Sequence, residues 1–420
     1  MSEPLEKRAL NNSFPIAKYI SFFLLISSSI LNPWAGKYWH KNFVNFNDVL
    51  MQYFVTSVLV GVFFLALHKY RSYFLKGNSL NIAVLTATIL LLILSDRFLL
   101  AVLGLPLWMP DMDNHYRHRP GIVRSWGPMY GNKVIRTNKF GHHDNDFPLA
   151  KSDNEFRALM LGDSITMGHG VTREETYSNQ LEGILEKARS AYGNFQIINA
   201  GVQGYSTFQE LNVLKKSMRF KPDFVAVGFC MNDVQEPFVI NKDFGGVGID
   251  YHGVTQVFNL FTSYLINETG YGRIIQTWRA RPEYANWCRD REIDDVKYMA
   301  SSARDNPHIS AGWDNVLSSL EELYELTAQN DINAVLLIFP HTFQLMNEDL
   351  QQPQRILRAH AKQNNVDFID FTTFFENLTS GQKDKVERYF LDLDHYTPEG
   401  HNLVARKIGH YLQEREYLVR

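Results

Sequence analysis

Five short apolar runs, separated by stretches with helical character, constrain the fold of this chain more than any other feature. The runs cover residues 156–161, 195–198, 223–229, 334–339 and 366–371. Runs of this length are typical of buried strands, and their alternation with helices predicts a parallel sheet with helices on both faces. Two capping boxes, Thr172 with Glu175 and Thr207 with Glu210, indicate helix starts, the first helix running to about residue 190. A closing helix is expected over residues 399–414. The prediction is an α/β fold with five parallel strands.

A Gly-Asp-Ser triplet that ends at Ser164 follows directly after the first apolar run. A serine on a sharp turn between a strand and a helix has its hydroxyl exposed at the carboxyl edge of the sheet, where open α/β folds place their chemistry. Asp392 and His395 lie near the C-terminus. Because an activated serine needs a base and the base needs an orienting carboxylate, these three residues predict nucleophilic acyl chemistry.

Two further polar blocks follow the second and third runs, one ending at Gly204 and one beginning at Asn232. In this order the four blocks resemble the SGNH subgroup of the GDSL hydrolases, over residues from about 133 to 420 and including the lead-in segment 136–141. The resemblance is to membrane-anchored bacterial members. It implies a three-layer, flavodoxin-like fold and a serine ester hydrolase that needs no metal and no cofactor.

The resemblance also implies a role for each matching residue. Ser164 would be the nucleophile, His395 the general base, and Asp392 the carboxylate that orients the base. The oxyanion hole would be formed by the backbone N–H groups of Ser164 and Gly204 and by the side-chain amide of Asn232. Preorganised donors of this kind stabilise the developing negative charge by about 3–4 kcal/mol each.

One departure from the family pattern is Cys230, which stands where a glycine usually precedes the asparagine block. We expect it to be a buried structural cysteine that alters the pocket shape; the alternative is a nucleophile. Asp394 is the alternative orienting acid, but its position next to His395 makes Asp392 the better candidate. Three other histidines are expected to be surface or supporting residues and not bases: His169, His341 and His401.

Histidines and aspartates of the kinds that bind metals gather between residues 111 and 144. Their spacing fits no helix or hairpin template for a metal site, so no metal is predicted. They are Asp111, Asp113, His115, His118, His142, His143 and Asp144.

The overall charge excludes one class of partner. The chain has 420 residues and a formal net charge of −3, with no basic stripe, which argues against nucleic-acid binding. It has two cysteines, Cys230 and Cys288, which predict no disulfide framework and leave open both their pairing and the redox compartment.

Residues 1–107 differ from the rest because apolar stretches dominate them. The stretches cover residues 19–36, 50–67 and 82–94, and the third resumes over 98–107 after Asp96 and Arg97. A bilayer core needs about 20 apolar residues per helix, so we expect a membrane anchor of three transmembrane helices, the alternative being three buried helices of a soluble domain. The charged pair is either an ion pair inside the third span or the marker of its end.

Lysine and arginine are distributed unevenly around these stretches, and this predicts an orientation. Six lie before the first stretch and between the second and third, against two between the first and second. The six are Lys7, Arg8, Lys18, Lys69, Arg71 and Lys76, and the two are Lys37 and Lys41. The positive-inside rule then places the N-terminus in the cytoplasm and, after three spans, the catalytic domain on the periplasmic or extracellular side of the inner membrane.

The rest of the chain divides into a linker at 108–150 that wraps onto the domain, and a hydrolase domain at 151–420. The domain carries an insert at about 235–312 that is rich in aromatic residues. Inserts at a catalytic edge are typically lids or substrate walls, although these aromatics could instead form a small core of their own.

The predicted function is cleavage of acyl esters, acetyl above all, on an envelope carbohydrate or lipid. The partners expected are therefore an acylated glycan or lipid, the bilayer and envelope polysaccharide machinery. Two alternatives stay open at this point. One is an O-acyltransferase that uses the same triad on a cell-surface polysaccharide, and the other is a non-catalytic, membrane-tethered domain that binds a glycan or a partner.

Overall fold

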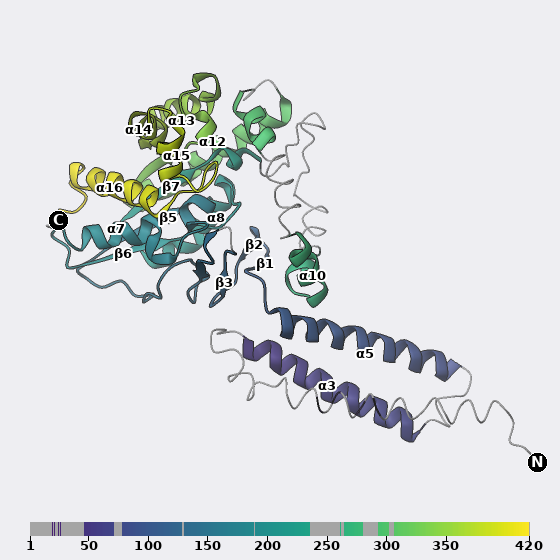
Figure 1. The fold of residues 1–420 in the computed structure, drawn as a ribbon. Helices are drawn as coiled ribbons and strands as arrows, with labels where there is room; N and C mark the ends of the chain where they lie inside the picture. The colour runs from purple at the N-terminus through teal and green to yellow at the C-terminus, as the bar shows by residue number, and fades with distance from the viewer. Residues whose placement is uncertain are drawn as a thin grey trace, which may run out of the picture. The chain divides into compact units, whose positions relative to one another are not determined.

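The computed structural model describes residues 19, 21, 24, 26, 46–70, 78–127, 130–188, 190–235, 261, 264–279, 293–301 and 306–419. The chain divides into two compact units, shown in Figure 1 with the elements labelled. The first comprises Met1–Met109 and Phe261–Arg281 and is called the anchor unit, after the membrane anchor predicted above. The second comprises Pro110–Leu260 and Pro282–Arg420 and is called the catalytic unit, after the hydrolase domain predicted above.

A five-stranded parallel sheet forms the centre of the catalytic unit, as predicted. Its strand order is β6-β5-β7-β8-β9, and every neighbouring pair is parallel. The strands are β5 (Glu155–Leu161), β6 (Asn194–Asn199), β7 (Phe224–Phe229), β8 (Asn333–Ile338) and β9 (Asp367–Asp370). Each contains or overlaps one of the five apolar runs. Because β5 and β7 are neighbours at the centre, the segments that follow them meet at the same edge of the sheet.

Helices cover both faces of this sheet, because alternate strand residues point to opposite sides. Leu159 and Leu161 of β5 belong to the core on one face, and Ala158 and Met160 to the core on the other. The first face is covered by α8 (Thr207–Ser217), α12 (Pro307–Gln329) and α13 (Gln352–Gln363), and the second by α7 (Tyr177–Leu185), α14 (Phe371–Thr379) and α16 (Pro398–Glu414).

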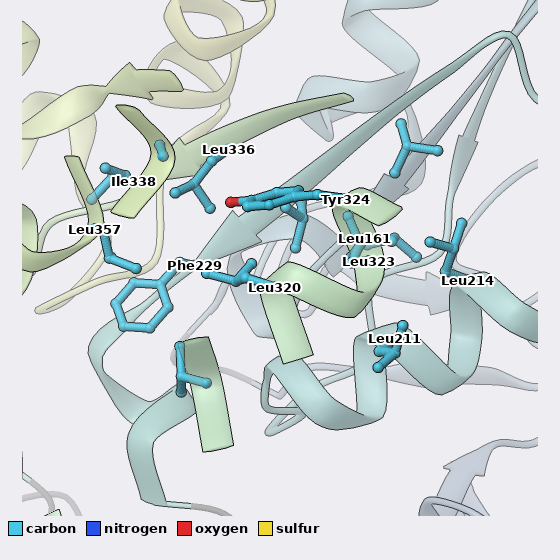
Figure 2. Packing of buried hydrophobic residues seen from close by; sticks show 14 of the residues in the cluster. Leu161, Leu211, Leu214, Phe229, Leu320, Leu323, Tyr324, Leu336, Ile338 and Leu357 are labelled. Carbon is cyan, nitrogen blue, oxygen red and sulfur yellow. The ribbon is translucent and has the colours of Figure 1, made fainter. Parts of the chain in front are cut away.

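Figure 2 shows the first core, in which leucines of α8 and α12 pack against strand residues such as Leu161 and Leu336. These side chains are fully or almost fully buried. Burying one leucine contributes about 1.5–3 kcal/mol, so the two cores together hold the sheet edge in place. Further short elements are α15 (Lys383–Tyr389) and the 3-10 turns Arg173–Glu175, Met218–Phe220, Met231–Gln235, Thr342–Gln344 and Glu348–Leu350.

Both predicted helix starts are displaced in the structure. The box formed by Thr172 and Glu175 closes only a 3-10 turn, because Thr176 is extended and becomes the N-cap of α7. The helix therefore begins at Tyr177 and ends at Leu185, short of residue 190. For α8 the capping pair is Ser206 with Gln209, one residue before the predicted pair.

Residues 108–150, predicted as a linker that wraps onto the domain, contain four short strands. β1 (Trp108–Asp111) pairs with β2 (His115–His118), and β3 (Val123–Ser125) is antiparallel to β4 (Val134–Arg136). The segment is hydrogen-bonded to β6 and to the short helix that follows β5: Asp144 accepts the backbone N–H of Asn199 at 3.0 Å, and His143 Nδ1 lies 3.0 Å from the carbonyl oxygen of Met167. These contacts make its C-terminal part a structural component of the catalytic unit.

The anchor unit contains α3 (Phe46–Lys69) and α5 (Asn78–Leu103), which pack through residues such as Tyr53, Phe64 and Leu94. Within the described residues, one stretch, 85–103 in α5, is long and apolar enough to cross a membrane. The corresponding stretch of α3, 53–69, is shorter. The predicted span 19–36 lies outside the described residues except for isolated positions, so three crossings remain a prediction.

The charged pair within the third apolar stretch does not end its helix. α5 continues through Asp96 and Arg97 to Leu103 without interruption. Part of the predicted insert, helix α10 (Gly270–Arg279), belongs to this unit and contacts α5. Four of the aromatic residues predicted to serve as a lid, a substrate wall or a small core lie outside the described residues, namely Tyr251, Phe258, Tyr284 and Trp287.

Candidate active site

The turn after β5 places Ser164 at the carboxyl edge of the sheet. Gly162 has a φ of +154°, and a Cβ there would lie 2.0 Å from Thr166 Oγ1, so only glycine fits. Asp163 caps the short helix α6 (Ser164–Met167) by accepting the N–H of Ile165 at 2.9 Å. Ser164, the first residue of α6, is 5% exposed. The local sequence thus fixes where its hydroxyl lies.

The structure brings His395 and Asp392 to this serine. His395 Nε2 lies 2.9 Å from Ser164 Oγ, and Nδ1 lies 2.9 Å from Asp392 Oδ2 and 3.0 Å from Oδ1. The carboxylate is held by its own turn, because Oδ1 also accepts the backbone N–H of His395 at 3.0 Å. With Nδ1–H donating to Asp392, Nε2 can accept the serine proton. Asp394 Oδ1 is farther from Nδ1, at 3.4 Å.

The electrostatics of the Asp392–His395 pair favour an ionised carboxylate beside a protonated imidazole. Burial alone lowers the pKa of His395, but the nearby carboxylates of Asp394 and Asp392 outweigh it and raise that pKa above its usual value. For Asp392, burial raises the pKa, but the charge of His395 and hydrogen bonds from its ring and backbone hold that pKa well below the usual range. The site therefore stabilises an imidazolium once a proton has been accepted.

All five predicted site residues line one cavity of about 270 Å³. Ser164 and the Asp392–His395 pair form one part of its wall, and Gly204 and Asn232 another. The side-chain amide of Asn232 donates to Asp163 Oδ2 at 3.1 Å, which fixes its nitrogen. An amide nitrogen carries two N–H groups, so a second donor is left for a bound group. The complete lining is Tyr130, Ser164, His169, Gln203, Gly204, Asn232, Ile293, Val296, His341, Asp392, Leu393, Asp394 and His395.

Trp126 and Tyr130, two aromatic residues of the segment predicted as a linker, contact residues at the site. The sequence analysis did not predict them. The His169 ring lies against that of His395, with ring centroids 4.5 Å apart, and the Trp126 ring lies 4.4 Å from that of His169. Tyr130 Oη lies 3.5 Å from Asp392 Oδ2. Trp126 and Tyr130 belong to no sequence motif. They reach the site because they lie between β3 and β4, which pair as a hairpin.

Cys230 is fully buried and unpaired, as expected of a structural cysteine. Burial raises the pKa of its thiol well above the usual value, so the sulfur is held as a poor nucleophile. Its Sγ lies 3.7 Å from His341 Nδ1, and His341 Nε2 lies 3.9 Å from Asp394 Oδ2. Burial lowers the pKa of His341 to about 3, so this histidine is neutral. Cys288 lies outside the described residues.

Several of the histidines and aspartates of residues 111–144 have structural partners. Asp111 accepts two backbone N–H groups of its own turn and pairs with Lys216 at 3.1 Å. His142 Nδ1 lies 3.0 Å from the carbonyl oxygen of Asn199, comparable to the bond made by His143. His401, the third supporting histidine, is buried and accepts the backbone N–H of Tyr177 at 3.2 Å.

Comparison with known proteins gives one family match. Residues 160–403, more than half of the chain, match the GDSL-like lipase/acylhydrolase family. No curated protein matches the chain. An acetylxylan esterase from Geobacillus stearothermophilus is 16% identical with a TM-score of 0.36, over 62% of this chain and 93% of that one. A two-domain esterase active on acetylated mannans is 15% identical with a TM-score of 0.37, over 62% of this chain and 49% of that one.

Proposed function

This chain belongs to the GDSL-like lipase/acylhydrolase family, and on that premise we propose that it is a serine esterase. It removes short acyl groups, acetyl above all, from a hydroxyl-bearing carbohydrate or lipid of the cell envelope. The observation that carries the proposal is the continuous contact from Ser164 Oγ through His395 to Asp392, with 2.9 Å at each step, on the wall of a cavity.

The proposed reaction has two halves. Ser164 Oγ attacks the ester carbonyl carbon while His395 Nε2 takes its proton, and Asp392 stabilises the imidazolium. Negative charge on the carbonyl oxygen is met by N–H donors of Ser164, Gly204 and Asn232. The alkoxide then leaves with the proton from His395, and the acyl group stays on Ser164. Water attacks this acyl-enzyme, His395 takes its proton and returns it to Ser164 Oγ, and the carboxylic acid is released.

The size of the cavity supports a short acyl group. At about 270 Å³ it lies below the range of about 300–1,000 Å³ that is typical of sites for drug-sized ligands. Its lining is mainly polar, including Gln203, Asn232 and His341, and Ile293 and Val296 contribute an apolar portion. An acetyl group attached to a polar alcohol suits these dimensions better than a long acyl chain.

An acyl-chain series tests the proposal. Purified full-length protein is given aryl esters with acetyl, butyryl and octanoyl groups, and acetylated oligosaccharides, and a fluorophosphonate probe reports activated serine. We expect labelling at Ser164 and fastest turnover of acetyl esters. Absence of both labelling and cleavage would support the non-catalytic alternative, and octanoyl preferred over acetyl would contradict the short-acyl proposal. Transfer of acetyl to an added sugar in place of release as acetate would identify an acyltransferase.

The protonation of His395 should determine how kcat/KM depends on pH. His395 must be neutral to accept the serine proton, and the carboxylates of Asp394 and Asp392 raise its pKa above about 6.5. We therefore expect kcat/KM to increase with pH and to reach half its maximum above pH of about 6.5. Asp394→Asn removes one negative charge near Nδ1, which destabilises the imidazolium and should move this midpoint to lower pH. An unchanged or higher midpoint in Asp394→Asn would contradict the assignment.

We also propose that the anchor unit crosses the inner membrane and that the catalytic unit lies outside the cytoplasm. The apolar stretch 85–103 of α5 and the excess of lysine and arginine on one predicted side support this orientation.

Reporters fused after residue 150 should give opposite signals on the two sides of the membrane. Alkaline phosphatase should be active at that position, because it matures outside the cytoplasm, whereas a fluorescent protein that matures only in the cytoplasm should stay dark. A fluorescent fusion with inactive phosphatase would place the catalytic unit in the cytoplasm and overturn the proposed location.

A further inference from the structure

Part of the insert in the hydrolase domain belongs to the anchor unit and not to the catalytic unit. Residues 261–281 group with residues 1–109, although the strands β2 to β7 lie between them in the sequence. Within the anchor unit, α10 contacts α5, the helix that contains the apolar stretch 85–103. The chain thus returns to the anchor in the middle of the hydrolase sequence.

Asp96 of α5 binds the start of α10 and thereby links the insert to the anchor unit. Its side chain is almost fully buried, and Oδ1 accepts the backbone N–H groups of Gly270 at 2.8 Å and Tyr271 at 3.3 Å. These are the first residues of α10, so a carboxylate from α5 caps the N-terminus of α10. Arg97 Nη2 donates to Asp96 Oδ2 at 2.8 Å and lies 3.5 Å from the carbonyl oxygen of Glu268. The charged pair in the apolar stretch therefore serves the contact with the insert.

Close backbone approach and a second set of hydrogen bonds fix α10 along α5. A Cβ on Gly270 would lie 2.2 Å from the carbonyl oxygen of Asp96 and 2.5 Å from Leu99 Cβ, so a larger residue would separate the helices. Arg273 Nε donates to the carbonyl oxygen of Gly104 at 3.0 Å, which satisfies a carbonyl just beyond the end of α5. Tyr271 Oη donates to the carbonyl oxygen of Leu92 at 3.3 Å.

α10 also exposes an apolar face, which begins at Tyr271, the residue whose hydroxyl contacts α5. Tyr271, Ile274, Ile275 and Trp278 are 41–50% exposed and follow the spacing i, i+3, i+4, i+7 of one helix face. On α5, Phe98 and Val102 are also exposed in the stretch that could cross a membrane. Tyrosine and tryptophan combined with aliphatic residues are typical of helices at the membrane–water interface. Because α10 is fixed on α5, we expect its exposed face to meet the same medium as the exposed residues of α5.

We propose that α10 is an interfacial membrane helix, a further element of the anchor, whose face of Tyr271, Ile274, Ile275 and Trp278 lies in the lipid bilayer. The proposal rests on the membrane location proposed above. It attaches the hydrolase sequence to the bilayer at a second place, in addition to the connection at about residue 107, and it gives the ion pair of Asp96 and Arg97 a function as the docking site for α10.

A fluorescent label at position 275 tests the proposal in the full-length protein. Ile275→Cys, in a Cys288→Ser background in which only buried Cys230 remains, is labelled with an environment-sensitive dye and reconstituted in vesicles of phosphatidylcholine and phosphatidylglycerol. Nitroxide-bearing lipids quench a dye that contacts the bilayer. We expect quenching at position 275, stronger with the nitroxide near the headgroup than with one at the middle of the acyl chain. Met346→Cys, on an exposed residue of the catalytic unit, is the unquenched control.

A label on α5 separates failure of this proposal from failure of the membrane location. Leu92→Cys lies on an exposed position of the apolar stretch. Quenching at 92 without quenching at 275 would overturn the interfacial helix and leave the anchor intact, whereas quenching at neither position would overturn the membrane location itself. A dye at 275 with blue-shifted emission but no lipid quenching would mean that a protein covers this face, which also contradicts the proposal.

Substitutions of Asp96 test how α10 is held. Asp96→Ala removes the acceptor for the first N–H groups of α10, so these amides should exchange hydrogen about 2- to 30-fold faster. Asp96→Asn retains a side-chain oxygen and should exchange at nearly the original rate. Fluorophosphonate labelling of Ser164 in both variants reports that the catalytic unit is folded. Equal exchange in Asp96→Ala and the unchanged protein would contradict the capping role.

Discussion

Replacing Ser164 by alanine is expected to lower ester hydrolysis by about 10⁴- to 10⁶-fold without unfolding the protein. The substitution removes the oxygen that lies 2.9 Å from His395 Nε2 and leaves the turn intact, because the capping bond from Ile165 N–H to Asp163 does not involve the serine side chain. Alanine also suits the first position of a helix. The measurement is kcat/KM for an acetyl ester, together with a thermal unfolding curve.

His395→Ala provides the matching control. Because members of a triad act as a unit, this variant should lose about as much activity as Ser164→Ala, and the double variant should lose little more than either one. Losses that multiply in the double variant would mean that the two side chains act independently. Hydrolysis within tenfold of the unchanged enzyme in Ser164→Ala would remove Ser164 as the nucleophile.

Replacing Asn232 by alanine is expected to lower kcat by about 10²- to 10³-fold with little change in KM. Asp163 holds the amide nitrogen at 3.1 Å and thereby fixes the direction of its second N–H. A donor fixed in this way stabilises charge that exists only in the transition state, so its loss affects the chemical step more than substrate binding. Steady-state kinetics with an acetyl ester gives both constants.

Asn232→Asp separates the donor from the volume of the side chain. The aspartate has nearly the same shape but an ionised form with no donor, so it should be at least as slow as Asn232→Ala. Activity restored by aspartate would mean that Asn232 mainly fills space. An increase in KM alone for either variant would assign Asn232 to substrate binding and place the oxyanion hole elsewhere.

The catalytic fold and the composition of its candidate site could be read from local patterns. Residues 156–161 alternate between two faces of a sheet, as Leu159 and Met160 do in the two cores, because side chains of a strand have a period of two. Asp392 and His395 are three residues apart, and their turn alone brings the carboxylate to Nδ1. Ser164 depends on a turn of a few residues after β5.

Helix starts were predicted less well, because a capping pattern competes with its neighbours. Thr207 matched the pattern, but its hydroxyl donates to Asp233 Oδ2 at 2.9 Å, and Ser206 caps α8 instead. Similarly, the box at Thr172 closes a turn that Thr176 then interrupts. Such choices depend on which partner the packed protein places near each hydroxyl, and sequence spacing does not contain that information.

The strands of the sheet and the polar residues at their ends could be predicted from the amino-acid sequence, because they follow from spacings of a few residues. Which distant residues meet depends on the packing of the folded chain. Ser164 and His395 are 231 positions apart, and Asp96 accepts an N–H from a residue 174 positions away. Trp126 and Tyr130 reach the site only through the β3–β4 hairpin. Contacts of this kind depend on how packed layers bring chain segments together, so a charged pair in an apolar stretch could be noticed in the sequence, but its partner could not.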